Sequence, residues 1–537
     1  MSSGLDTAHR APLRLWPLGL FLLVFLIGTS LPGTARPQDG PGPSPAKAPD
    51  PKAGADGRDP DKTPGPEAPP GGENAGETPD KAPDKAPDGT PAGDRDAAAA
   101  GLKTGRLEIE SSIGERLRSV IGLLAILGIC FALSNNRSRI SWRLVAIGIG
   151  LQVLFGVIVL KTPPGERLFR FVNDLVMTLL GYSNRGAEFL FGRLLDPGFA
   201  GAHIAFSVLP TIIFFSCLMA VLYHVGVMQA VVRGLAVVMQ KTMGTTGAET
   251  LSAAGNIFVG QTEAPLLIRP FVSGMSESEL MAVMTGGFAT IAGGVLAAYV
   301  NFLQARFPDI AGHLMTASIM SAPAALVCAK IMVPEPHPEN TATWGTIPEG
   351  LDSPDENLVD AAARGASEGL TLALNVGAML LAFLALVYLA NDFVGYGFEA
   401  TGLASAMGFE GTERVTLEWL LGQALRPLTW LMGVEWQDTG KVGGLFGTKT
   451  ILNEFVAYSQ LGTKLAEDPN WIAPRSLVIV SYSLCGFANF GSIGIQIGGI
   501  SGIAPERRGD LARLAMRAMI GGTLAAFMTG TVAGILV

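Results

Sequence analysis

The sequence has 537 residues, of which 48% are hydrophobic and only 16% are charged, and its mean hydropathy is +0.38. About a quarter of the residues of soluble proteins are charged, so this composition indicates a membrane protein. The net charge of −8 comes without a basic stripe, which argues against a protein that binds nucleic acid.

Two segments precede the main apolar part of the chain. Residues 1–35 place Arg10 and Arg14 before an apolar run and end in small residues up to Ala35, which is the order of a secretory signal peptide. An uncleaved anchor helix is the alternative interpretation. Residues 36–104 are rich in Pro, Gly, Ala and Asp and almost lack large apolar side chains, which predicts a disordered spacer.

Eight apolar stretches follow, each long enough to cross about 30 Å of hydrocarbon as a helix. Long runs without alternation exclude a β-barrel, so the predicted fold class is an all-α integral membrane protein. The predicted spans are 118–134, 144–160, 204–223, 280–302, 311–333, 370–390, 478–500 and 511–536.

Arginine-rich loops predict the orientation of the chain, because short cytoplasmic loops collect Lys and Arg. If the first span enters the membrane from the outer side, the first and the last arginine-rich loops both lie in the cytoplasm. Eight crossings then leave the spacer and the C-terminus on the outer side, which is the periplasm if the protein lies in a bacterial inner membrane. The arginines are Arg137, Arg139 and Arg143 in the first loop and Arg507, Arg508 and Arg513 in the last.

The segment 250–274, with "GNIFVGQTEAPLL" at its centre, is too polar to cross as a simple helix. We predict a re-entrant hairpin in which Gly260 allows close approach and Pro265 begins the returning helix. A carboxylate near the bilayer centre costs about 2.5 to 3.5 kcal/mol, so Glu263 is a candidate functional residue. Glu263 could instead form a buried pair with Arg269.

A second polar segment, 444–461, predicts a second hairpin with Glu454 inside it. Glu454 could alternatively pair with Lys449. Each hairpin is followed by a glycine-interrupted span, at 284–299 and 483–499. This repeated order, with an odd number of crossings between its copies, predicts two inverted repeats, the plan of secondary transporters with a site near the middle of the membrane.

The predicted organisation therefore has a scaffold and two transport repeats. Amphipathic stretches at 166–182 and 227–241 predict interfacial helices. The acidic segment 335–357 is interpreted as a solvated loop. The predicted parts after the spacer are 105–249 (scaffold and interfacial helices), 250–333 (first transport repeat with spans 4 and 5), 334–440 (acidic loop, sixth span and external helix) and 441–537 (second transport repeat with spans 7 and 8).

Enzymatic chemistry finds no support in the sequence. The histidines lie far apart, no HExxH motif is present, and no Ser/His arrangement is apparent, so we expect neither a histidine-ligated zinc centre nor an intramembrane hydrolase. Asn256 and Asn489 are either site residues or caps of broken helices, because Asn is common at caps.

Five strings together resemble the concentrative nucleoside transporter family over the chain from about residue 118 to its end. They are "GNIFVGQTEAPLLIRPFV", "TIAGGVLA", "TKTILNEFVAYSQL", "CGFANFGSIGIQIGG" and "APERRGDLARLAMRA". The resemblance implies a bacterial member of that family and a homotrimer, in which each protomer has a scaffold and a mobile transport part with its own nucleoside site.

The resemblance also implies which residues contact the nucleoside. In the first hairpin and the fourth span, the expected nucleobase contacts are Gln261, Thr262, Glu263 and Val295. The second hairpin and the seventh span are expected to contact the ribose through Glu454, Asn489 and Ser492, with Phe487 near the base. Gly491 stands where the family frequently has serine.

A sodium site is implied in the same way, with Thr290 in place of a more usual serine. Its expected ligands are Asn256, Val259, Thr290 and Ile291. The expected function is a sodium-coupled symporter that imports nucleosides by alternating access in the plasma membrane of a bacterium. A proton-coupled symporter and a passive nucleoside channel or receptor are the alternatives.

Overall fold

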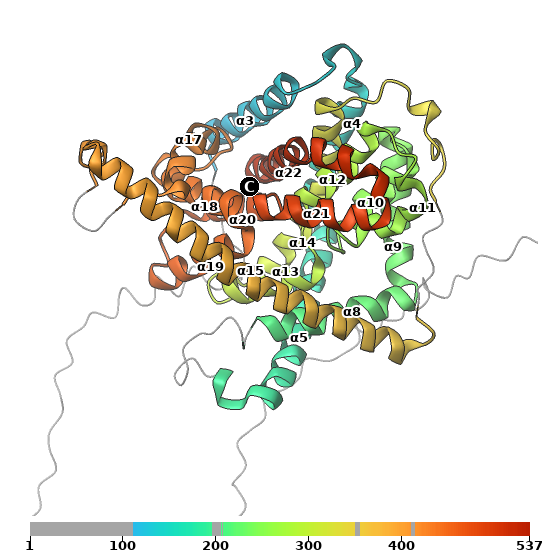
Figure 1. Cartoon of the computed structure of the whole chain (residues 1–537), viewed down its shortest axis with the longest axis horizontal. Coiled ribbons are helices and arrows are strands. Elements are labelled where there is room, and N and C mark those ends of the chain that lie inside the picture. The colour runs from blue at the N-terminus through green and yellow to red at the C-terminus, as the bar shows by residue number, and fades with distance from the viewer. Residues whose placement is uncertain (1–110, 196–205, 207, 349–354, 410–413) are drawn as a thin grey trace, which may run out of the picture. The chain divides into compact units, whose positions relative to one another are not determined.

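The computed structural model describes residues 111–195, 206, 208–348, 355–409 and 414–537 (Figure 1). The predicted signal peptide and spacer lie outside these residues. Within them every regular element is a helix, and the protein is an all-α integral membrane protein. The α-helices are α3 (Ile113–Ala132), α4 (Trp142–Lys161), α5 (Pro163–Phe191), α8 (Leu209–His224), α9 (Val227–Met243), α10 (Gly247–Gly255), α11 (Arg269–Val272), α12 (Glu277–Ala289), α13 (Gly293–Leu303), α14 (Ile310–Met332), α15 (Leu358–Ala400), α16 (Leu403–Ala406), α17 (Leu417–Leu431), α18 (Thr439–Ile451), α19 (Glu454–Glu467), α20 (Pro474–Leu484), α21 (Phe490–Ile503) and α22 (Arg508–Leu536).

The long helices agree with the predicted spans. In the described part of the chain, five elements are long and apolar enough to cross a membrane, and the pair α8 and α9, bent by 77°, adds a sixth if it is one span. The predicted first span corresponds to α3. The predicted seventh span is divided into α20 and α21, of 11 and 14 residues, by the break that the sequence indicated.

Both predicted hairpins and both broken spans are present. The first hairpin consists of α10, an irregular turn over 256–263, the 3₁₀ helix η3 (Ala264–Ile268) and α11. The second consists of α18 and α19, separated by only two residues. Thr290 has extended backbone angles of φ −122° and ψ 170°, and it ends α12 before α13 begins at Gly293. The same order of elements therefore occurs twice.

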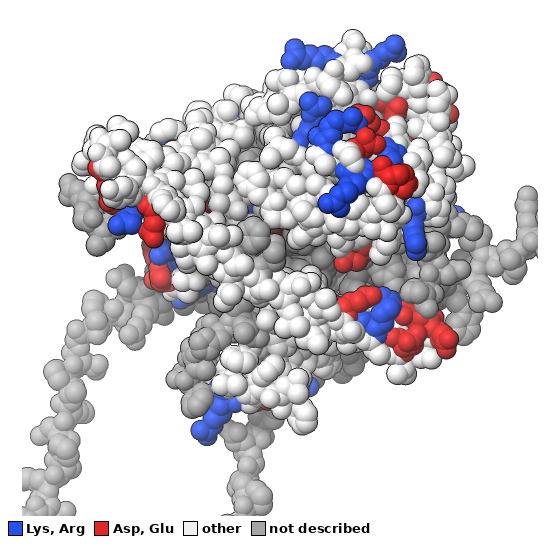
Figure 2. Space-filling view, viewed as in Figure 1, with Lys and Arg blue, Asp and Glu red and all other residues white. Residues whose placement is uncertain are grey.

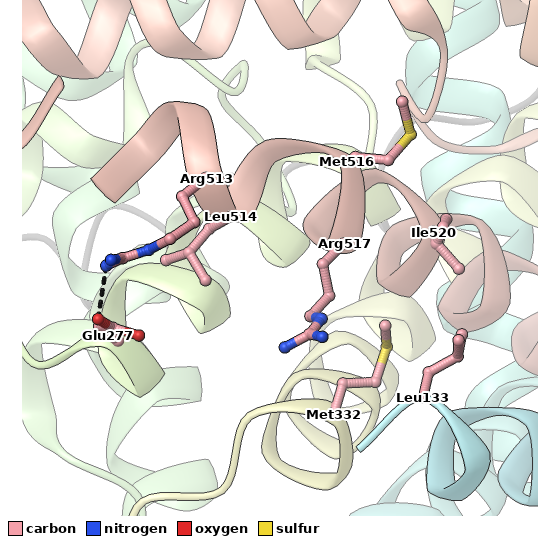
Figure 3. Close-up of a pocket in the computed structure, with 8 residues that line it drawn as sticks. All are labelled: Leu133, Glu277, Met332, Arg513, Leu514, Met516, Arg517 and Ile520. Carbon is pink, nitrogen blue, oxygen red and sulfur yellow. Dashed lines mark hydrogen bonds and ion pairs between the residues drawn. The ribbon is translucent and has the colours of Figure 1, made fainter. Parts of the chain in front are cut away.

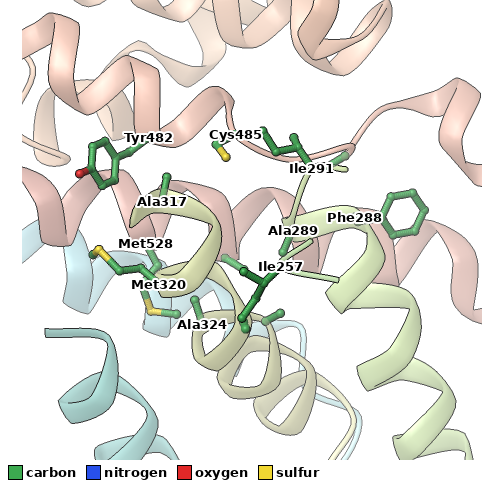
Figure 4. Close-up of a cluster of buried hydrophobic side chains, with 14 of the residues drawn as sticks. Ile257, Phe288, Ala289, Ile291, Ala317, Met320, Ala324, Tyr482, Cys485 and Met528 are labelled. Carbon is green, nitrogen blue, oxygen red and sulfur yellow. The ribbon is translucent and has the colours of Figure 1, made fainter. Parts of the chain in front are cut away.

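The helices of the first repeat form the buried centre of the molecule. Burial reaches 89% both in the apolar window of Glu277–Leu303 and in that of α14, against 12% in α15. Met320 and Ala324 of α14 belong to a buried apolar cluster with Ile257 and Phe288 (Figure 4). The long helix α15 instead leaves most of its apolar side chains uncovered by the rest of the chain.

The prediction of a solvated loop at 335–357 is wrong for its central residues. Thr343 is buried with 3% exposure. The Gly247 N–H donates to the Thr343 carbonyl and the Ala248 N–H donates to the Thr343 hydroxyl, each over 3.0 Å. The first N–H groups of a helix have no acceptor within the helix. This loop supplies the acceptors for the first N–H groups of α10. The acidic composition of the loop predicted exposure to solvent and gave no sign that Thr343 is buried.

A buried ionic cluster, which the sequence analysis missed, joins the first hairpin to α12 and α14. Lys330 Nζ lies 2.6 Å from Glu249 Oε2, and both side chains are almost fully buried. Lys330 also donates to the Ser278 hydroxyl over 2.9 Å. The Thr246 hydroxyl donates to Glu279 Oε1 over 2.6 Å. The start of the hairpin is thereby held to α12 and α14.

Replacing Lys330 by methionine is expected to lower the free energy of unfolding by about 3 to 5 kcal/mol, because it leaves the Glu249 carboxylate buried without a counter-charge. Thermal unfolding of the detergent-purified protein measures the loss. Lys464→Met is the matched control, since Lys464 forms an exposed pair with Glu467 and exposed pairs contribute little. Equal unfolding temperatures for the two variants would contradict a structural role of the cluster.

Candidate functional site

Glu454 lies where the second hairpin meets both broken spans. It is the first residue of α19 and is buried, with 4% exposure. The Tyr299 hydroxyl of α13 donates to Glu454 Oε1 over 2.9 Å. Asn489 Nδ2, in the break between α20 and α21, donates to Glu454 Oε2 over 3.2 Å. One carboxylate therefore joins the hairpin to the first repeat and to the second broken span.

Asn489 has two roles at once. Its side-chain Oδ1 accepts from the Ser492 N–H over 2.8 Å and begins α21, so the capping interpretation is confirmed. Its amide nitrogen is the group that donates to Glu454. Asn453 similarly begins α19 by accepting from the Val456 N–H over 2.9 Å. α19 and α21 begin at these asparagines. Their first N–H groups, and the positive ends of their helix dipoles, therefore lie at the turn of the second hairpin and at the break between α20 and α21.

The tip of the first hairpin bonds to α21 through Gln261. Gln261 Nε2 donates to the Ser492 hydroxyl over 3.2 Å, and Gln496 Nε2 donates to Gln261 Oε1 over 3.1 Å. Gln496 also donates to the Met284 carbonyl of α12. Gln496 was not predicted as a site residue, although it lies four residues after Ser492 and so on the same face of the helix.

Two glycines allow this contact. A Cβ on Gly287 of α12 would lie 2.6 Å from Gln496 Nε2 and 2.9 Å from the Cβ of Gln261. A Cβ on Gly499 would lie 2.7 Å from Thr262 Cγ2. Any larger residue at either position would separate the hairpin tip from the broken spans. Gly287 and Gly499, one in each broken span, thus allow close approach of the hairpin tip.

Glu263 differs from Glu454 in its surroundings. It is exposed, and its Oε2 lies against the position that a Cβ on Gly260 would take, so glycine there leaves room for the Glu263 carboxylate. Among the described residues, no ion pair includes Glu263 or Glu454. Lys449 donates instead to the Ser483 carbonyl over 2.8 Å. The alternative of a pair between Glu263 and Arg269 is therefore wrong. Lys449 makes no direct ion pair with Glu454, but the two buried charges interact electrostatically.

The two breaks contact each other directly. The Phe487 N–H donates to the Thr290 carbonyl over 3.2 Å, which joins the second broken span to the first. Ile291 and Cys485, one from each break, belong to the same buried cluster (Figure 4). Val295 is buried near the start of α13, and Phe487 is half-buried. Of the predicted nucleoside residues, the structure joins Gln261, Glu454, Asn489 and Ser492 through hydrogen bonds.

Asn256, which directly follows α10, has an unusual environment. It is fully buried, and neither its Oδ1 nor its Nδ2 has a hydrogen-bond partner among the described residues. A Cβ on Gly286 would lie 3.4 Å from its Nδ2, and the Gly286 carbonyl accepts from the Thr290 hydroxyl over 2.9 Å. Buried polar groups without a partner are rare and indicate an ion or water that completes them.

Other oxygen atoms of the first hairpin and the first broken span also lack partners among the described residues. In the described part of the chain, the carbonyls of Val259 and Ile291 receive no hydrogen bond from the backbone. The buried hydroxyls of Ser252 and Thr285 also lack partners there. No cluster of three or more His, Cys, Asp or Glu side chains is found in the described residues. A site made of neutral oxygens suits an alkali cation better than a transition metal.

Family profiles match three consecutive parts of the chain. Residues 121–194 match the N-terminal region of the Na+-dependent nucleoside transporters, and residues 313–534 match the C-terminal region. Residues 205–306, which include the first hairpin, match a profile described as nucleoside recognition. Together these parts cover most of the described chain.

Two individual proteins with similar sequences support the same family. The chain is 43% identical over 422 residues to the uncharacterized transporter YutK of Bacillus subtilis, across 78% of this chain and 99% of that protein. It is 42% identical over 434 residues to solute carrier family 28 member 3 of Mus musculus, across 79% of this chain and 59% of that protein. It spans less than two thirds of the length of the mammalian relative.

Solved structures of the transporter CNTnw have the same fold. The inward-facing, substrate-bound state matches with a TM-score of 0.69 at 40% identity, over 78% of this chain and 98% of that one. A variant in an outward-facing state matches with a TM-score of 0.71 at 40% identity, over 79% and 98%. These relatives are transporters, not enzymes. The chain belongs to the concentrative, Na+-dependent nucleoside transporter family.

Proposed function

We propose that the protein is a sodium-coupled symporter that imports nucleosides against a gradient by alternating access. The observation that carries the proposal is the hydrogen-bonded network from Tyr299 through Glu454, Asn489 and Ser492 to Gln261. It connects both hairpin tips to both broken spans, so a solute bound there contacts both hairpins and both broken spans. Sites at such breaks are the plan of secondary transporters.

Glu454 is assigned to the ribose. An ionised carboxylate has about four lone-pair positions, and Tyr299 and Asn489 occupy one on each oxygen. The remaining positions accept from two vicinal hydroxyls, a pair that ribose presents and that most other small solutes lack. Ser492 and Asn489 complete this side of the solute. The two protein donors also fix the carboxylate in place before the solute arrives.

The nucleobase is assigned to the first hairpin. Gln261 carries both a donor and an acceptor, now bonded to Ser492 and Gln496, and an amide of this kind pairs with the edge of a base. Thr262 and the exposed Glu263 add further polar contacts. The apolar faces of the base are assigned to Val295 and Phe487.

Sodium is assigned to the neighbourhood of Asn256. The Asn256 side chain, the hydroxyl of Thr290 and the carbonyls of Val259 and Ile291 offer oxygen ligands beside the C-terminal end of α10, where the helix dipole is negative. An amide does not titrate, so its unpartnered oxygen favours a metal cation over a proton as the coupling ion. Bound sodium would hold the hairpin against the first break and raise nucleoside affinity, and by linkage the nucleoside would raise sodium affinity equally.

The assembly is assigned as a homotrimer in a bacterial inner membrane. The apolar α15, only 12% buried within one chain, is a suitable contact between subunits. Similarity to both inward-facing and outward-facing structures supports alternating access. The arginine-rich loops support an outer location of the C-terminus.

Uptake of uridine into proteoliposomes tests the function. An inward sodium gradient is expected to drive internal uridine above the external concentration, and a proton gradient without sodium is not. Collapsing the sodium gradient should release the accumulated uridine. Internal uridine that never exceeds the external concentration would indicate a passive channel. Accumulation driven by protons alone would indicate proton coupling.

A further inference from the structure

A cavity of about 450 Å³ lies away from the hairpins, beside the start of α22 (Figure 3). The ends of α3 and α14 and the beginning of α12 form its other sides. Apolar side chains make up much of the lining, with two arginines from one face of α22 and the carboxylate of Glu277 from α12. The side chains used below are Leu133, Met332, Arg513, Met516, Arg517 and Ile520.

The two arginines are not equivalent. Arg513 lies 2.5 Å from Glu277 Oε1 and 2.8 Å from Asp510 Oδ1, so its charge is largely neutralised. Arg517 has no ion pair or hydrogen bond among the described residues. Figure 3 shows its guanidinium directed from α22 into the cavity. A half-buried guanidinium carries five N–H donors, and here they are available to an anion.

The cavity lies at the edge of the apolar layer. Arg517 is the last charged residue of the chain, because residues 518–537 contain none, so its side chain marks the depth at which hydrocarbon begins. Exposed Trp142, at the start of α4, is of the type that anchors helices at membrane interfaces. Figure 2 shows Lys and Arg side chains, with Asp and Glu side chains between them, gathered over the start of α22. A ligand of this cavity therefore has access from the lipid–water interface.

We propose that this cavity binds an anionic phospholipid of the cytoplasmic leaflet. The lipid phosphate bonds to the free guanidinium of Arg517, with Arg513 as a second, shared cation. The upper part of an acyl chain lies against Met516, Ile520 and Leu133. A small free anion would use only the arginines and leave the apolar wall in water. The phospholipid satisfies both halves of the lining, and the site shares no residue with the nucleoside network.

Native mass spectrometry of the full chain in neutral detergent tests this proposal, with phosphatidylglycerol or phosphatidylcholine added. Wild-type protein is expected to retain phosphatidylglycerol in a saturable manner and phosphatidylcholine weakly. Arg517→Gln is expected to weaken phosphatidylglycerol binding about tenfold or more, because a charge-assisted hydrogen bond is lost. Met516→Ser should weaken it also, through the acyl chain.

Arg508→Gln is the matched control. Arg508 is exposed on the same helix and the same side of the membrane but does not line the cavity, so it removes the same charge and should leave phosphatidylglycerol binding unchanged. Equal weakening by both substitutions would overturn the proposal in favour of general attraction to negative lipid. Competition by inorganic phosphate as strong as by the lipid would overturn it in favour of a free-anion site. Unchanged binding in Arg517→Gln would overturn it outright.

Discussion

Glu454→Gln is expected to reduce nucleoside uptake by about a hundredfold or more while leaving the protein folded. The substitution keeps the size of the side chain, and the Tyr299 hydroxyl can still donate to the remaining oxygen. It removes the negative charge and one acceptor oxygen. Two charge-assisted hydrogen bonds to ribose hydroxyls, at about 1.5 to 3 kcal/mol each, would be weakened or lost. Uridine binding and sodium-driven uptake by purified protein in proteoliposomes measure the effect.

Glu467→Gln is the control for this experiment, because Glu467 ends the same helix and is exposed in a pair with Lys464. It should transport normally. Competition by nucleosides that lack a ribose hydroxyl adds a second readout. Wild-type protein should discriminate against them, and Glu454→Gln should discriminate less. Normal uptake by Glu454→Gln, or unchanged discrimination, would remove Glu454 from the ribose site.

The positions of the hairpins and breaks were predictable from local chemistry. Polar residues within apolar segments, with Pro265 after the first turn and glycines inside two spans, conflict with a continuous lipid-facing helix. That conflict is visible without knowing the fold. The same applies to Asn489, since asparagine before a helical segment indicates a cap.

The side chains that bond to these residues could not be predicted from the sequence. Tyr299 meets Glu454 across 155 positions, and Gln496 meets Gln261 across 235. Such pairs depend on how the two repeats pack against each other, and no local sequence pattern predicts that packing. Lys330 shows the same limit: it lies at the end of an apolar span, where a lysine commonly reaches the interface, but it is buried against Glu249.

Asn256→Ala is expected to raise the sodium concentration needed for half-maximal uptake by about tenfold or more, because a ligand is removed from the proposed ion site. Its effect on stability is more diagnostic. No described residue bonds to the Asn256 side chain, so its loss leaves no protein group unpaired, and thermal stability without sodium should stay near that of the wild type. An ion that binds the folded state raises its unfolding temperature. Sodium should therefore stabilise the wild type, relative to potassium, and stabilise Asn256→Ala much less.

Asn301→Ala provides the opposite pattern. Its side chain bonds to Thr211 and to Gln304, so alanine should lower the unfolding temperature in either salt while the response to sodium persists. The same change, asparagine to alanine, thereby distinguishes an asparagine that supports the structure from one that binds the ion. Should Asn256→Ala lose stability equally in both salts and keep its sodium response, the amide is structural and the coupling ion binds elsewhere.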